Sequence, residues 1–120
     1  MNARVRRVLP LLVLVGTAWA GVQMLGDWRG ERLGREVAHA ARAGDIVMLS
    51  SETCVFCAEA RRWFDTHGVA YRECFIERDA ACAEAYRALQ APGTPTLVVR
   101  GQRIVGLDVQ RIAQALERDS

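Results

Sequence analysis

Cys54 and Cys57, two cysteines separated by two residues, are the side chains whose type and spacing most directly suggest chemistry. A Cys-x-x-Cys pair is typical of a redox dithiol, but it also serves as half of a zinc site or occurs by chance. Here the flanking sequence favours the redox interpretation. An apolar run at 46–49 predicts a buried strand before the pair, and apolar residues at helical spacing predict a helix from Cys54 to about Thr66.

A cysteine at the N-terminus of this predicted helix should be reactive. Unpaired backbone N–H groups and the positive end of the helix dipole favour a thiolate, so they should lower the pKa of the Cys54 thiol. We therefore expect Cys54 to attack a disulfide and the less exposed Cys57 to resolve the mixed disulfide that results. Phe56, which lies between the two cysteines in sequence, is expected to contact the substrate.

The composition is that of a single globular domain. The chain has 120 residues, of which 51% are hydrophobic and 25% are charged. Its formal net charge is +2, but from residue 26 onward 13 arginines face 14 acidic residues. This balance gives no support to nucleic-acid binding. All 16 basic residues are arginine, which excludes lysine chemistry.

Residues 1–25 predict an export signal or a membrane anchor, because a head with three arginines precedes 18 mostly apolar residues at 8–25. Two interpretations stay open. The small residues Ala18 and Ala20 resemble a signal-peptidase site, whereas the apolar length suffices for a membrane-spanning helix. Both predict that the following domain lies outside the cytoplasm, in the bacterial periplasm, either exported or anchored to the inner membrane.

The rest of the chain predicts an α/β domain behind a linker. Residues 26–44 predict an amphipathic linker helix that stops at Gly44, and residues 45–120 predict the domain. The expected element order within the domain is β-α-β-α-β-β-α. A parallel strand pair, extended by an antiparallel hairpin and covered by helices, is the economical way to pack that order. Beyond the first strand and helix, elements are expected at 69–76, 80–89, 96–100 and 103–105, followed by a last helix capped by Asp108.

Three motifs in this order resemble the glutaredoxin branch of the thioredoxin-like superfamily. They are the Cys54–Cys57 pair after the first strand, Thr94-Pro95-Thr96 before the third, and Val105-Gly106-Leu107-Asp108 before the last helix. The resemblance covers about 45–116. It implies a thioredoxin-like fold with a four-stranded mixed sheet flanked by helices, and thiol–disulfide oxidoreductase activity.

The same resemblance implies roles for individual residues. Cys54 would be the nucleophile, Cys57 the resolving cysteine, and Pro95 a cis-proline packed beside the pair. The backbone of Thr94 would pair with an extended substrate in a strand-addition mode. Three residues before the last helix would complete the substrate site, namely Gly106, Leu107 and Asp108.

Differences from the usual glutaredoxin pattern affect the expected substrate. Val55-Phe56 replaces Pro-Tyr between the cysteines, Ser51-Glu52 stands where a lysine is usual, and Val105-Gly106 replaces Gly-Gly. The lysine and the glycine pair help to bind the carboxylates of glutathione. Glu52 adds a negative charge that opposes both an anionic ligand and a thiolate. The sequence therefore favours a protein disulfide or a partner redoxin, with glutathione as an alternative co-substrate and no resident cofactor.

A second cysteine pair, Cys74 and Cys82, lies outside the usual family pattern. Of the three possible connectivities, 54–57 with 74–82 is favoured because each pair is close along the chain. A structural disulfide is the simpler expectation, and a second redox-active pair is the alternative. Two other readings of the chain stay open, a four-cysteine zinc site and a redoxin-fold module that binds a partner without turnover.

Overall fold

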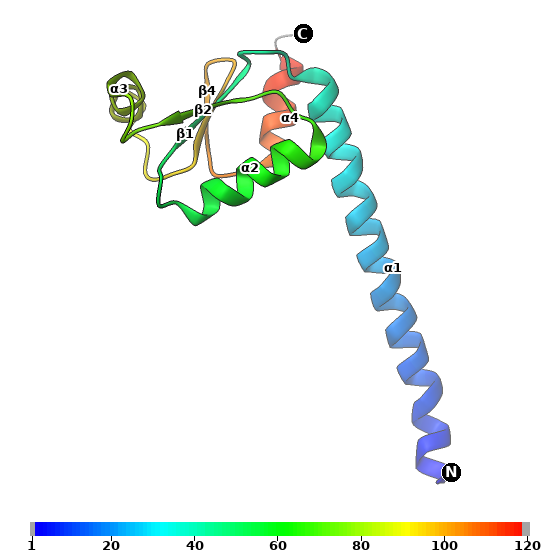
Figure 1. Cartoon of the computed structure of the whole chain (residues 1–120). Helices are drawn as coiled ribbons and strands as arrows, with labels where there is room; N and C mark the ends of the chain where they lie inside the picture. The colour runs from blue at the N-terminus through cyan, green and yellow to red at the C-terminus, as the bar shows by residue number, and fades with distance from the viewer. Residues whose placement is uncertain (1, 119–120) are drawn as a thin grey trace. The chain divides into compact units, whose positions relative to one another are not determined.

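The computed structural model describes residues 2–118, which divide into two units between Arg32 and Leu33. The first unit is helical and the second is an α/β domain (Figure 1). The element order is α1 (Ala3–Ala40), β1 (Ile46–Ser50), α2 (Val55–His67), β2 (Arg72–Phe75), α3 (Ala80–Ala88), β3 (Thr96–Val99), β4 (Gln102–Val105) and α4 (Val109–Arg118).

The N-terminal unit is the exposed, apolar part of α1. By length and composition alone, α1 is a helix that could cross a membrane, and a signal sequence would meet the same criterion. The helix continues past residue 25, where the sequence predicts the end of the signal or anchor, and it ends at Ala40. The predicted stop at Gly44 is four residues too late, because residues 41–45 form a turn in which Gly44 adopts a φ of 88°.

The domain is built on a four-stranded mixed sheet with the order β2-β1-β3-β4. Strand β1 pairs in parallel with β2 and antiparallel with β3, and β3 pairs antiparallel with β4. This arrangement confirms the predicted thioredoxin-like fold class. Strand β2 is shorter than the predicted 69–76, because the N–H of Val69 bonds to the Phe64 carbonyl, at 2.9 Å, as part of the end of α2.

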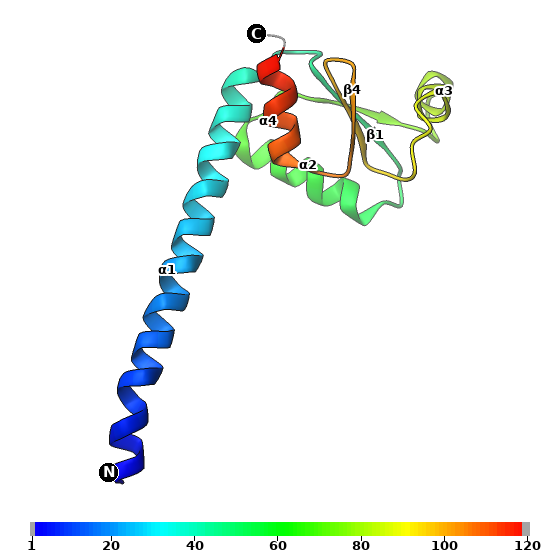
Figure 2. The same cartoon turned by 180° about the vertical axis from the view of Figure 1, so that it is seen from behind.

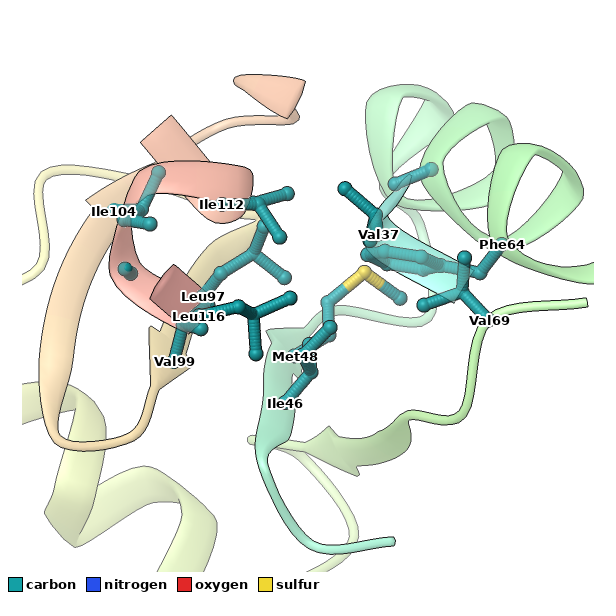
Figure 3. Packing of buried hydrophobic residues seen from close by; sticks show 12 residues of the cluster. Val37, Ile46, Met48, Phe64, Val69, Leu97, Val99, Ile104, Ile112 and Leu116 are labelled. Carbon is teal, nitrogen blue, oxygen red and sulfur yellow. The ribbon is translucent and has the colours of Figure 1, made fainter. Parts of the chain in front are cut away.

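Side chains along β1 point to both faces of the sheet, and the domain has a hydrophobic core on each face. Ile46 and Met48 face the main core, which α2, α4 and Val37 of α1 also enter, whereas Leu49 faces α3 on the opposite side. Figures 1 and 2 both show α3 across the sheet from α2 and α4. Side chains from six elements meet in the main core around the residues labelled in Figure 3, including Met48 beside Val37 and Phe64.

Capping residues define both ends of helix α2. Cys54 is its N-cap, and Gly68 ends it in the left-handed conformation, with a φ of 65°, as the sequence predicts. Ala60 and Phe64 are fully buried against the sheet. Burial of a phenylalanine side chain contributes about 1.5–3 kcal/mol. The core therefore fixes the direction of α2 and with it the position of the Cys54–Cys57 pair beyond the end of β1.

Candidate active site

Cys54 and Cys57 form a disulfide at the start of α2, with their Cα atoms 5.2 Å apart. The backbone N–H of Cys57 donates to Cys54 Sγ at 3.1 Å, so the sulfur itself caps the helix. Cys57 is fully buried, whereas Cys54 is partly exposed. A substrate approaching from solvent therefore meets Cys54 first, which is the arrangement that a nucleophilic and a resolving cysteine require.

The surroundings of Cys54 Sγ act on its charge in opposite directions. In the reduced state, the Cys57 N–H and the helix N-terminus would stabilise a thiolate. The carbonyl oxygen of Thr94 lies 3.4 Å from the same sulfur and can accept a hydrogen bond only from a protonated thiol. Since the Cys57 N–H and the helix dipole act together against one carbonyl, the thiolate is favoured.

The segment facing the cysteine pair is held in a defined conformation. The Thr94–Pro95 peptide bond is cis. The hydroxyl of Thr96 donates to the Gly93 carbonyl at 2.6 Å, and the N–H of Gly106 donates to the Pro95 carbonyl at 2.9 Å. These bonds connect the loop before β3 to the end of β4 and keep the Thr94 carbonyl beside Cys54.

A groove of about 560 Å³ lies next to the pair, between α2, the loop before β3 and the end of β4. Most of the substrate-contacting residues expected from sequence meet there. Phe56 lies at one side with 70% of its surface exposed. The ten residues that line the groove are Phe56, Glu59, Ala60, Pro92, Gly93, Thr94, Pro95, Val105, Gly106 and Leu107.

Two residues differ from the sequence-based picture of this groove. Asp108 was expected to bind substrate, but it is not among the lining residues, and its carboxylate accepts from the N–H of Arg111 at 3.2 Å as the cap of α4. Glu59 lines the groove although the sequence reasoning did not select it. Its spacing of three residues from Phe56 places both on one face of α2, and that spacing is the signal that was missed.

The loop before Cys54 is bonded to the loop after β2. Arg78 pairs with Glu52, and the Glu77 carboxylate accepts from the Ser51 hydroxyl and, at 3.3 Å, from the Glu52 N–H. The hydrogen bond from Ser51 lowers the pKa of Glu77 below its ordinary value. Glu52, expected from sequence to add a negative charge that opposes both a thiolate and an anionic ligand, is thus paired with Arg78.

Cys74 and Cys82 form the second disulfide, with Cα atoms 5.5 Å apart. Both are buried with Leu49 in the small core beneath α3, on the face of the sheet opposite α2. The disulfide joins β2 to α3 and encloses the loop that carries Glu77 and Arg78. Within residues 2–118, no group of three or more histidine, cysteine or acidic side chains is placed to hold a metal ion.

The family model described as Glutaredoxin matches residues 46–104, from the first residue of β1 into β4. The matched segment includes both cysteine pairs and the cis-proline. No curated protein matches the chain.

Solved structures with the same fold include proteins of the redoxin class. A variant of the thioredoxin-like protein BC3987 is 25% identical, with a TM-score of 0.51, and the match covers 59% of this chain and 97% of that one. A glutaredoxin from Methanosarcina mazei is 22% identical, with a TM-score of 0.51 and coverages of 61% and 78%. Buckwheat glutaredoxin in complex with glutathione is 15% identical, with a TM-score of 0.50 and coverages of 75% and 89%.

Proposed function

We propose that the chain is a glutaredoxin-like thiol–disulfide oxidoreductase that acts on protein disulfides outside the cytoplasm, and the match of the Glutaredoxin family model to residues 46–104 and the shared thioredoxin-like fold support this proposal. The observation that carries the proposal is the partly exposed Cys54 at the N-terminus of α2, with Cys57 buried behind it and a groove alongside. This is the geometry of a dithiol that first bonds to a large partner and then releases it.

The exchange takes place in two balanced steps. The Cys54 thiolate attacks one sulfur of the substrate disulfide, a bond forms between the two proteins, and the second substrate sulfur leaves as a thiolate. Cys57, as a thiolate, then attacks Cys54 Sγ, the mixed disulfide breaks, and the first substrate sulfur leaves. The substrate gains two electrons and the dithiol loses two. A partner redoxin or another thiol must reduce the pair before the next cycle.

Protein substrates suit the groove better than glutathione does. Glutathione carries two carboxylates and is net negative, and none of the ten lining residues is basic. The buckwheat glutaredoxin structure holds glutathione, so glutathione stays the alternative co-substrate for this chain. The exchange chemistry needs no resident cofactor.

Reduction of insulin by the purified full-length chain, with dithiothreitol as the terminal reductant, tests the proposal. The wild type should reduce insulin, and Cys54→Ser should abolish the protein-dependent rate. Cys57→Ser should retain attack but reduce insulin more slowly than the wild type, since only dithiothreitol can then resolve the mixed disulfide. Equal insulin reduction by wild type and Cys54→Ser would contradict the proposal.

We also propose that the domain lies outside the cytoplasm, and the support is α1, which is apolar enough for a signal or an anchor. Expression of the full chain in a Gram-negative bacterium, followed by fractionation, tests this part. Recovery from the periplasm or from carbonate-washed inner membranes would support it. Recovery of the intact chain from the cytoplasmic fraction would contradict it without affecting the redox proposal.

A further inference from the structure

Exposed apolar side chains of the domain gather around the active cysteines. Among residues 33–118, three large apolar side chains are strongly exposed, namely Val55 (69%), Phe56 (70%) and Val105 (45%). Val55 and Phe56 separate the two cysteines in sequence, and Phe56 and Val105 line the groove. Exposed apolar patches that are rimmed by polar residues often mark sites where a protein binds a partner or a ligand.

One charge is built into this apolar groove. Glu59 follows Phe56 by three residues on α2 and is the single charged residue among the ten that line the groove. No hydrogen bond or ion pair of Glu59 with the described residues 2–118 is present, so its carboxylate is free to meet a ligand. An unpaired carboxylate beside a binding surface favours a cationic partner.

Three arginines of the domain are engaged with other groups. Arg61 bonds to Glu73, and Arg78 pairs with Glu52. Arg103, on the edge strand β4, donates to the carbonyls of Leu89 and Gln90 at 3.3 and 3.1 Å. The groove therefore presents an apolar surface with a negative charge.

We propose that this groove selects protein disulfides whose cysteine is flanked by an apolar residue and, within reach of Glu59, by a lysine or arginine. Glu59 is then a specificity-determining residue, and Phe56 and Val105 hold the apolar neighbour. The inference rests on the proposed function and names the chemistry of its substrate. An extended segment is required, since the Thr94 backbone and the groove lie along one side of Cys54.

Matched peptides test the inference in a single turnover that needs no external reductant. Each peptide carries one cysteine bonded to 5-thio-2-nitrobenzoate and a leucine beside it, with lysine, glutamine or glutamate two residues away. Attack by reduced Cys54 forms the peptide–Cys54 disulfide and expels the coloured thiolate, and Cys57 then releases the peptide thiol. The second-order rate constant is read from the absorbance of the expelled thiolate.

The wild type should react about fivefold faster with the lysine peptide than with the glutamate peptide. This ratio corresponds to ~1 kcal/mol, which is the free energy that one exposed ion pair can contribute. The ratio should fall as salt is added. Glu59→Gln should bring it near one, and Glu59→Lys should invert it. Glu84→Gln is the matched control, because Glu84 is an exposed residue of α3, on the far face of the sheet. That variant should keep the fivefold preference.

The possible negative results distinguish the specificity inference from the proposed redox function. Equal rates with the lysine and glutamate peptides in the wild type, or a preference that survives Glu59→Gln, would overturn the inference and leave the redox function intact. The same mixed disulfide made with glutathione should react more slowly than the lysine peptide, and an equal or faster rate would also overturn it. Absence of Cys54-dependent release from every peptide would contradict the proposed function itself.

Discussion

The thiol of Cys54 should have a pKa below the ordinary cysteine value of ~8.5. The Cys57 N–H, 3.1 Å from Cys54 Sγ, and the N-terminus of α2 both stabilise negative charge on that sulfur. Cys57→Ser leaves Cys54 as the unpaired thiol, so the rate of its alkylation by iodoacetamide against pH reports its titration. The same protein in denaturant is the control and should titrate near ~8.5. A folded-state value at or above that would indicate a binding module instead of an active dithiol.

A second residue-level prediction concerns Glu73, which connects α2 to the sheet. Its carboxylate accepts from Arg61 Nε at 2.7 Å and from the Ser50 hydroxyl at 2.8 Å. The bonds from Arg61, and to a lesser degree from Ser50, lower the pKa of Glu73 below its ordinary 4.5, against the opposing effect of burial. Because the folded-state pKa is lowered, the stabilisation is fully present above about pH 4.5 and is lost as the pH falls through the folded-state value.

Arg61→Met should therefore lower the free energy of unfolding by about 1 kcal/mol at pH 7 and by less near pH 3. Urea denaturation at the two pH values measures the difference. Arg62→Met is the control, since Arg62 is an exposed neighbour on α2 and is not among the groups that lower the pKa of Glu73. An equal loss at both pH values would mean that Arg61 acts through packing, including its contact with the Phe75 ring at 5.9 Å.

The disulfide between β2 and α3 should stabilise the fold without taking part in exchange. It closes a loop of seven intervening residues, and cross-linking a loop of that length restricts the unfolded chain by about 2 kcal/mol. Cys74→Ser combined with Cys82→Ser should lower the free energy of unfolding by about that amount, measured in urea, and should leave a folded protein able to reduce insulin. Loss of insulin reduction in a folded double variant would instead identify the pair as a redox relay.

Packing of the end of α1 on α2 depends on a glycine. A Cβ added to Gly34 would lie 2.3 Å from Cδ2 of His67, whose ring stacks on Trp63 with centroids 4.4 Å apart. Gly34→Ala should thus destabilise the domain by about 1 kcal/mol despite the helix preference of alanine. Gly30→Ala is the control, because a Cβ added to Gly30 would have no neighbouring atom within 4 Å. If thermal unfolding shows equal stability for both variants, the His67 ring moves aside.

Local sequence signals predicted most of the architecture of the domain. Gly68 ends α2, and Asp79 and Asp108 cap α3 and α4 as expected, because capping depends on residues close along the chain. The parallel pair of β1 with β2 and the antiparallel hairpin of β3 with β4 were expected from the element order. The boundaries of α1 and β2 were less accurate, since turn geometry and tertiary bonds determine them.

The composition of the site was predictable only in part. Three ordered motifs identified the cysteine pair and both walls of the groove. The pairing of Glu52 with Arg78 joins residues 26 positions apart, and no local pattern indicates such a contact. The spacing of Glu59 from Phe56 was visible in the sequence, but the importance of Glu59 depends on the absence of basic side chains around a groove that only the folded chain forms.

The central claim for the whole molecule is that Cys54 forms a mixed disulfide with a protein substrate. Cys57→Ser in the full-length chain, mixed with insulin and analysed by intact mass and peptide mapping, measures this directly. We predict a covalent adduct through Cys54 that dithiothreitol removes and that does not accumulate in the wild type, where Cys57 releases it. Absence of the adduct while Cys54 remains freely alkylated would contradict the claim and leave a redoxin fold that binds without turnover.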